Sequence, residues 1–241
     1  MSVPSASLRR RDPVQTRARL LQAATREFGS RGFAGARIER IVARAGCNIR
    51  MIYHHFGSKA ALYRAVVEAA YADLRAKEAA LMLDLDDPFR CLDELLRFTM
   101  RYFAEHPDFE GLIRSENDLG GRVVGSSGSI GASGDVLKGR VAQIVAAGEQ
   151  AGLFRPGIDP SQLYVTITAL SRFHLANAHS LSAVLGLDMH SPDWRAGWAD
   201  HAVDLIRRFI AAGNGFASRG GPADDAGALP PAQEALPSIE T

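Results

Sequence analysis

The chain has 241 residues, 46% of them hydrophobic, which is enough for one large domain or two small ones with a buried core. No apolar run approaches the roughly 20 residues of a membrane helix, and the N-terminus lacks the apolar stretch of a secretory signal. The two cysteines, Cys47 and Cys91, are too few for a disulfide framework or a metal knuckle. We therefore expect a cytoplasmic protein with reduced thiols and no membrane partner.

The net charge of +1 hides a strong asymmetry along the chain. Residues 1–59 contain 12 arginines and lysines against three acidic residues, a net charge of +9, whereas the remainder has 16 basic and 24 acidic residues, or −8. A basic module on an acidic body is typical of a protein that binds a polyanion with one end. A general DNA-packaging protein, the non-specific alternative, would be basic throughout.

The first elements suggest a flexible arm followed by a helix. Residues 1–12 are predicted to form the basic arm, and Asp12 with Pro13 has the pattern of an N-cap and first helical residue. The helix is expected to end at Gly29 and Gly32. Its apolar face at helical spacing consists of Leu20, Leu21, Ala24 and Phe28.

Two short helices come next, over residues 37–46 and 49–56, separated by a tight turn that contains Gly46. This pattern predicts a helix-turn-helix. Asn48 stands where an N-cap belongs, because its side chain can accept a hydrogen bond from an early amide. Ser58 is expected to cap a long fourth helix in the same way.

The rest of the chain keeps a helical pattern, so the predicted fold is all-α. The segment 119–135 is rich in glycine and serine and is predicted to be a mobile loop, while 159–186 is predicted to be one long helix. Ser191 is expected to cap the last helix, and residues 214–241 lose all periodicity and are predicted to be disordered. The other expected helices cover residues 59–82, 87–107, 108–118, 136–152 and 191–213.

The second helix of a helix-turn-helix enters the major groove with polar side chains outward and apolar ones inward. Ile52 and Phe56, four residues apart, are predicted to be buried. Arg50 can donate two hydrogen bonds to guanine, and Ile49 or Met51 can contact a thymine methyl. The side chains predicted to reach phosphates are Tyr53, His54 and Lys59, the last beside a helix N-terminus.

These residues resemble the DNA-binding domain of TetR-family transcriptional regulators over roughly residues 14–67. The family's hallmark run is matched by Tyr53, His55, Phe56, Ser58, Lys59 and Leu62. The resemblance implies a three-helix DNA-binding domain at residues 13–59 and a helical ligand-binding and dimerisation domain at 60–213. It also implies a homodimer on a near-palindromic operator, most often a repressor released by a small-molecule effector, with no cofactor.

Two positions depart from the family pattern, and both add positive charge to the DNA face. Arg37 occupies the place where the family has a capping Thr or Ser before the second helix, and Arg50 replaces a residue that is often small. The residues predicted to contact DNA are therefore Arg37, Asn48, Ile49, Arg50, Met51, Tyr53, His54 and Lys59.

In the body, six residues are candidates to line a ligand cavity, although aromatic and Met stripes are more often core. They are Met100, Phe103, Phe109, Phe173, His174 and Asn177. His174 and Asn177, three residues apart on one predicted helix, could contact a partner subunit instead of a ligand. The last two long helices carry excess apolar surface, predicted to pair in a four-helix dimer interface. That surface comprises Leu163, Ile167, Leu170, Leu181, Leu185, Trp198, Val203, Ile206 and Ile210.

The main alternative is an enzyme, a hydrolase, because the glycine- and serine-rich stretch around Ser133 partly resembles a nucleophile elbow. The Gly-x-Ser-x-Gly pattern is not met there and no predicted strand precedes it. His54 and His55 are adjacent and point to different faces, so they do not form a metal site on one helix. We therefore expect no catalytic residue and no metal ligand.

Overall fold

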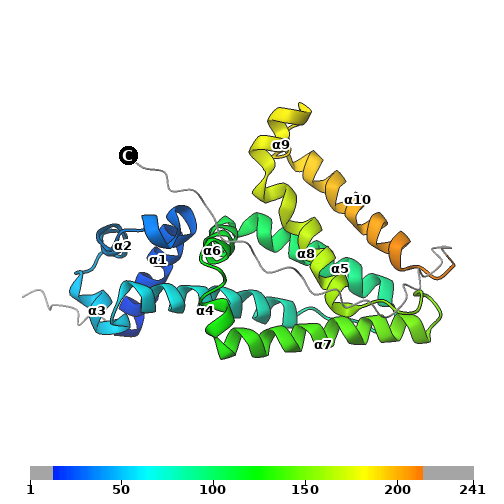
Figure 1. The fold of residues 1–241 in the computed structure, drawn as a ribbon, viewed down its shortest axis with the longest axis horizontal. Helices are drawn as coiled ribbons and strands as arrows, with labels where there is room; N and C mark the ends of the chain where they lie inside the picture. The colour runs from blue at the N-terminus through cyan, green and yellow to red at the C-terminus, as the bar shows by residue number, and fades with distance from the viewer. Residues whose placement is uncertain (1–12, 214–241) are drawn as a thin grey trace, which may run out of the picture.

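The computed structural model describes residues 13–213, and these form ten α-helices, one short 3-10 helix and no β-strand beyond an isolated bridge between Phe154 and Ala211. The all-α prediction is confirmed for this part of the chain. Three helices form the head at one end of the molecule (Figure 1). They are α1 (Pro13–Gly35), α2 (Ile38–Ala45) and α3 (Arg50–Phe56).

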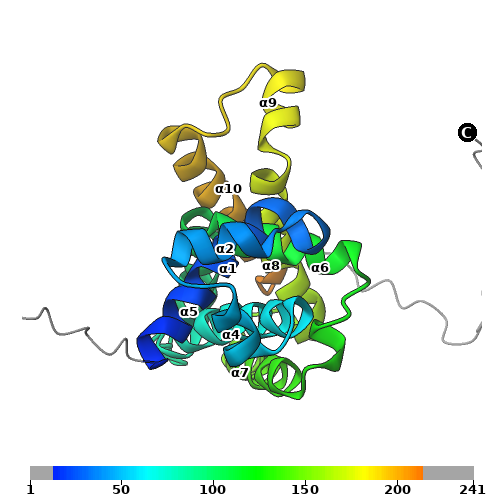
Figure 2. The same cartoon turned by 90° about the vertical axis from the view of Figure 1, so that its left-hand side faces the viewer.

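The remaining helices form the body, which α4 joins to the head (Figure 1). They are α4 (Lys59–Ala79), α5 (Pro88–Glu105), α6 (Pro107–Asp118), α7 (Gly128–Gln150), α8 (Pro160–Ala176), α9 (Ala178–Leu185) and α10 (Pro192–Ile210), with the 3-10 helix η1 at Val124–Ser126. In a view turned by 90°, α9 and the adjoining ends of α8 and α10 stand away from the other helices (Figure 2). No helix of the described residues combines the length and apolar character needed to cross a membrane.

Side-chain caps set where several helices begin. Ser58 accepts a hydrogen bond from the Ala61 amide at 3.0 Å, and Ser191 accepts one from the Trp194 amide at 3.2 Å, as the sequence predicts. Each cap satisfies one of the amides that the first turn of a helix leaves without a partner. The predicted cap Asp12, the arm at 1–12 and the tail at 214–241 lie outside the described residues.

The head and the body each have their own hydrophobic core. The head core is built around Leu20, Phe28, Ile41, Ile52, Leu62 and Val66, all fully buried. The main body core includes Leu92, Leu96, Val141, Ile144, Leu163, Ile167, Ile206 and Ile210. Because Leu62 and Val66 lie on α4, this helix belongs to the head core at its N-terminal end and runs on into the body.

Two sequence predictions about helix limits are wrong, and one is confirmed in part. The first helix runs through Gly29 without a break, but its backbone leaves the helical conformation at Gly32, one of the two predicted ends, where φ is 66° and ψ is 179°, before a last helical segment that ends at Gly35. The predicted loop 119–135 is largely helical, because α7 already begins at Gly128 and buries Ile130 and Leu137. The predicted long helix 159–186 is divided at Asn177 into α8 and α9.

The head meets the body where α1 crosses α6 at two glycines. A Cβ atom at Gly111 would lie 1.9 Å from the carbonyl oxygen of Gly29, and one at Gly29 would lie 2.6 Å from the carbonyl oxygen of Asp108. Only glycine allows two helix backbones to approach so closely. This crossing fixes α6, an element of the body, directly against the first helix of the head.

A buried polar contact joins three helices beside the crossing. The Ser115 hydroxyl on α6 accepts hydrogen bonds from the Phe33 amide of α1 and from the Tyr63 hydroxyl of α4, each at 3.1 Å. Burial raises the pKa of Tyr63 to about 12, so its hydroxyl stays protonated and remains a donor at neutral pH. The position of the head therefore depends on α6 as well as on α4.

Candidate nucleic-acid interface and effector region

The turn between α2 and α3 is set by a glycine and an asparagine. Gly46 ends α2 in the left-handed conformation, with φ of 61°, and donates its amide to the carbonyls of Ala43 and Val42. The Asn48 side chain accepts a hydrogen bond from the Arg50 amide at 2.9 Å. It thus satisfies an early amide as predicted, although Ile49 is the residue immediately before the helix.

The exposed face of α3 carries most of the predicted DNA-contacting side chains. Ile49, Arg50, Tyr53 and His54 are exposed, and Tyr53 retains 56% of its accessible surface. Ile52 is fully buried, whereas Phe56 is only half-buried. The second helix of the motif therefore presents one arginine, one tyrosine and one histidine to solvent along a single short face.

Met51 differs from the prediction that it faces outward. Its side chain is half-buried and packs against the head core. Met51 lies next to Ile52 and on the same side of α3 as His55, four residues later, which is also half-buried. Ile49 is therefore the better placed of the two apolar candidates for a thymine methyl group.

Lys59 is held close to the protein surface. Its ammonium nitrogen lies 5.0 Å from the ring centroid of Phe33, a cation–π distance, and the residue is half-buried. Arg17 has a similar arrangement, with its guanidinium 5.1 Å from the ring of Phe56. Sequence reasoning did not single out Arg17, because its position beside the end of α3 depends on how α1 crosses that helix.

Arg37 precedes α2 and, as the sequence suggested, supplies no side-chain cap. Glu27 of α1 makes a different contact at this point: its carboxylate accepts a hydrogen bond at 3.2 Å from the amide of Arg37 itself, the residue before the helix. Glu27 is only 3% exposed and also forms an ion pair with Arg40 at 3.7 Å. A carboxylate from a neighbouring helix therefore anchors the residue that precedes α2, while the first turn of α2 has no side-chain cap and the Arg37 side chain is exposed.

The six candidate ligand residues do not meet in one cavity. Phe103 and Phe109 are buried in an aromatic cluster with stacked rings 5.7 Å apart. Phe173 is 61% exposed and, with Asn177, lines a hollow of about 490 Å³ on the outer face of α8.

Met100 and His174 line a separate groove, of about 280 Å³, between α5, α8 and α10. The six candidates are therefore distributed between two hollows and the buried core, and which of them contacts a ligand stays a prediction. Their spacing along single helices carried no information about which helices meet.

Ser133, the candidate nucleophile of the hydrolase alternative, lies within α7. Its hydroxyl donates a hydrogen bond to the Ile130 carbonyl at 2.8 Å, as serine side chains in helices often do. The residue is half-buried on a regular helix and not on a strained strand-to-helix turn. The geometry of a nucleophile elbow is absent at this position.

Comparisons with known proteins agree with this geometry. The model of bacterial regulatory proteins of the tetR family matches residues 20–66, and a tetracyclin repressor-like C-terminal domain model matches residues 88–206. The HTH-type transcriptional repressor NicS of Pseudomonas putida is 36% identical over 208 residues, which cover 86% of this chain and 98% of that protein. The chain belongs to the TetR family.

Two further similarities are more limited. One covers less than half of the chain, and the other shows a shared fold. The HTH-type transcriptional repressor SCO4008 of Streptomyces coelicolor is 40% identical over 103 residues, 43% of this chain and 50% of that protein. The crystal structure of a TetR transcriptional regulator from Chloroflexus aurantiacus has a TM-score of 0.63 at 22% identity, covering 83% of this chain and 98% of that one. This TetR-family chain is a DNA-binding transcriptional regulator.

Proposed function

We propose that the protein is a homodimeric repressor that binds a near-palindromic operator and leaves it when a small molecule binds the body. The observation that carries the proposal is the exposed face of α3, where Arg50, Tyr53 and His54 stand clear of the head core. The names of the relatives NicS and SCO4008, both called transcriptional repressors, support this direction of regulation. We expect the protein to act in the cytoplasm, where the bacterial chromosome lies.

The dimer is supported by apolar surface that the protomer leaves exposed on α8 and α10. Val165 and Phe173 are 65% and 61% exposed, and Leu205 and Phe209 are 41% and 48% exposed. Of the nine residues expected from the sequence, Leu163, Ile167, Val203, Ile206 and Ile210 are instead buried in the body core, whereas Leu185 of α9 is 57% exposed. The proposed interface still uses α8 and α10, but through exposed side chains next to the predicted buried ones.

Release of DNA requires a ligand that prefers a conformation in which the two heads do not fit successive major grooves. Three elements of this chain link the body to the head. They are α4, shared between the head and the body, α6, which crosses α1 at Gly29 and Gly111, and the start of α7, whose Ile130 packs in the head core. A shift of any of these helices would change the position of the head.

The test is selection of genomic DNA fragments by the purified protein, followed by titration of the selected fragment and of random DNA of equal length. We expect a near-palindromic motif and a preference of at least about 1,000-fold for the selected sequence, as specific regulators show. Equal affinity for the selected and random fragments would contradict the proposal and favour a general DNA-binding protein.

A further inference from the structure

The groove between α5, α8 and α10 is lined by arginine and aromatic side chains, none of which is among the predicted DNA contacts. Its volume is about 280 Å³, near the lower end of the roughly 300–1,000 Å³ of small-molecule sites. Three arginines line it, Arg97 and Arg101 from α5 and Arg195 from α10. Met100 and Trp198 contribute apolar walls.

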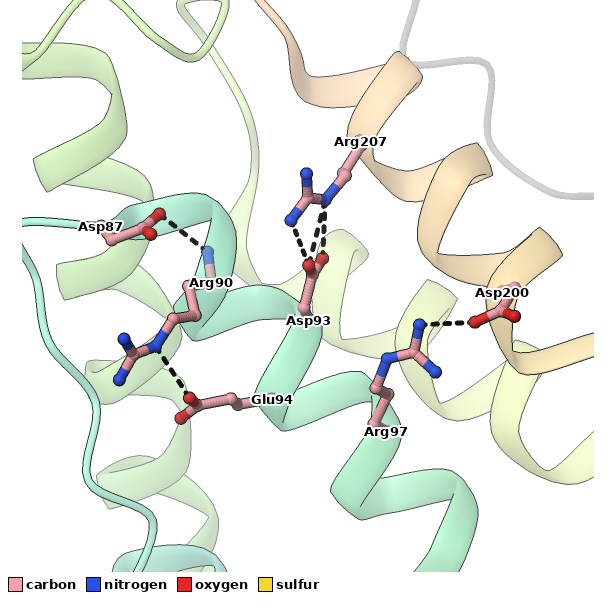
Figure 3. A network of polar contacts seen from close by, with 7 residues as sticks. All are labelled: Asp87, Arg90, Asp93, Glu94, Arg97, Asp200 and Arg207. Carbon is pink, nitrogen blue, oxygen red and sulfur yellow. Dashed lines mark hydrogen bonds and ion pairs between the residues drawn. The ribbon is translucent and has the colours of Figure 1, made fainter. Parts of the chain in front are cut away.

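The positive charge of the groove is only partly balanced. Arg97 donates a hydrogen bond to Asp200 of α10 at 2.6 Å, next to a second ion pair between Asp93 and Arg207 (Figure 3). Arg101 and Arg195 form no ion pair with any residue that the structure describes. The Nε atom of Arg195 is buried without a hydrogen-bond partner, which is unfavourable unless an acceptor occupies the groove.

The aromatic side of the groove is held in a fixed position. The indole rings of Trp194 and Trp198 are stacked with centroids 5.7 Å apart and planes at 6°. His174 is 5% exposed, and its ring lies 5.6 Å from each indole. The Trp198 indole N–H and the His174 Nδ1–H both donate to the Leu170 carbonyl, at 2.9 and 3.2 Å, so neither ring can turn freely.

His174 adds no positive charge to the groove at neutral pH. Burial, together with the nearby charge of Arg195, lowers the pKa of its imidazole below the ordinary value. The two arginines without ion pairs are therefore the groups that select a ligand by charge, and the rigid rings are the groups that select it by shape.

We propose that this groove binds a small aromatic carboxylate, whose carboxylate group takes hydrogen bonds from Arg101 and Arg195 and whose ring packs against Trp198. Guanidinium groups pair with carboxylates through parallel hydrogen bonds, and they require no other cofactor or ion. The limited volume suits one or two rings. A phosphate ester could use the same arginines, and the experiment below distinguishes the two.

The ligand's role as effector rests on the regulatory function proposed above. The α5 wall of the groove ends at Ala104, one turn before the start of α6, the helix that crosses α1. The exposed apolar residues proposed for the dimer, Val165, Phe173, Leu205 and Phe209, are not part of the groove lining. The proposed dimer contacts and the proposed ligand contacts therefore use different side chains of α8 and α10.

The experiment is isothermal titration calorimetry of the full chain, without DNA, against benzoate and 2-naphthoate. The neutral amides of both acids and phenyl phosphate serve as comparison ligands. Binding can also be located by fluorescence, because one of the two tryptophans of the chain, Trp198, lines the groove and the other, Trp194, is stacked on it. Arg101→Gln and Arg195→Gln remove one charge each, and Arg114→Gln on the exposed side of α6 is the matched control.

We expect at least one carboxylate to bind with a dissociation constant below about 10 mM and to change tryptophan fluorescence in a saturable way. Each groove variant should weaken binding by roughly tenfold or more, because a charge-assisted hydrogen bond is lost, whereas Arg114→Gln should bind like the wild type. Arg101 is exposed, so its variant tests the charge without disturbing the core.

Three results would overturn the proposal: no saturable binding of either carboxylate, amides that bind as tightly as the acids, or tighter binding of phenyl phosphate. Operator affinity measured with and without the carboxylate is a separate readout. If the carboxylate binds but leaves operator affinity unchanged, the effector role is wrong. Failure of the protein to select any operator would instead count against the proposed function.

Discussion

Arg50 stands exposed in the first turn of α3, where a guanidinium can reach the edge of a base. We predict that Arg50→Ala relaxes preference at one position of the operator by about 1–3 kcal/mol, because a bidentate contact to guanine is lost. Tyr53→Phe removes a hydroxyl assigned to a phosphate and should weaken binding to all sequences alike. Titration of single-base operator variants measures both, and a uniform loss for Arg50→Ala would reassign Arg50 to the backbone.

Glu27 is the residue on which the start of α2 depends. We predict that Glu27→Ala destabilises the protein by about 1–3 kcal/mol, because the Arg37 amide loses its acceptor and Arg40 loses its partner. Glu39→Ala is the control, since Glu39 is an exposed acid on α2 itself and should change stability far less. Urea unfolding followed by circular dichroism measures the difference, and equal stabilities would show that the contacts of Glu27 with Arg37 and Arg40 do not stabilise the head.

Local signals at single residues were predictable from the sequence, whereas contacts between helices were not. The caps at Ser58 and Ser191 involve an amide three residues away, so the sequence contains both partners. Glu27 accepts a hydrogen bond from the Arg37 amide across two helices, and its importance appears only when α1 and α2 are packed together. The same limit explains why Met100 and His174 share a groove that excludes Phe103.

At the scale of elements, α7 shows why a composition rich in glycine and serine was misleading. The first two turns contain Gly128, Gly131 and Gly134, which favour a loop by propensity. The helix forms nevertheless because Ile130 packs against the head core and Leu137 against the body core. Tertiary packing of an apolar face outweighs propensities of about 1 kcal/mol per glycine.

The close crossing of α1 and α6 leads to a prediction about a glycine at the contact between the two helices. Gly111→Ala should destabilise the protein by about 1–3 kcal/mol and alter operator affinity, because the added methyl group forces the two helices apart. Gly139→Ala in α7 meets no atom within 4 Å and should instead stabilise by up to about 1 kcal/mol, since alanine favours a helix. Thermal unfolding of both variants tests this, and a Gly111→Ala protein as stable as wild type would contradict the tight crossing.

At the scale of the whole molecule, charge is concentrated at one end of the chain, with +9 in residues 1–59. We predict that operator affinity falls steeply with salt, because each neutralised phosphate releases counterions. Deleting residues 1–11 removes Arg9, Arg10 and Arg11 and should both weaken binding and flatten the salt dependence. Titrations at several salt concentrations measure the slope, and an unchanged slope would mean that the arm makes no phosphate contact.

The proposed dimer gives the last prediction. Sequence periodicity selected buried core residues of α8 and α10 for its surface, and the exposed apolar side chains of the same helices are the ones to test. Phe173→Asp and Phe209→Asp place a charge on the exposed apolar sides of α8 and α10, where burial against a partner would leave it unpaired. Each should shift the protein toward monomer and reduce operator affinity, since two linked heads bind one operator together.

Val136→Asp is the matched control, as Val136 is 64% exposed on α7, a helix that is not part of the proposed interface. Sedimentation at micromolar concentration measures the association state of all three variants. A monomeric wild type that binds a palindromic site with full affinity would rule out the dimer. Equal association of the Val136 and Phe209 variants would instead move the interface to another surface of the molecule.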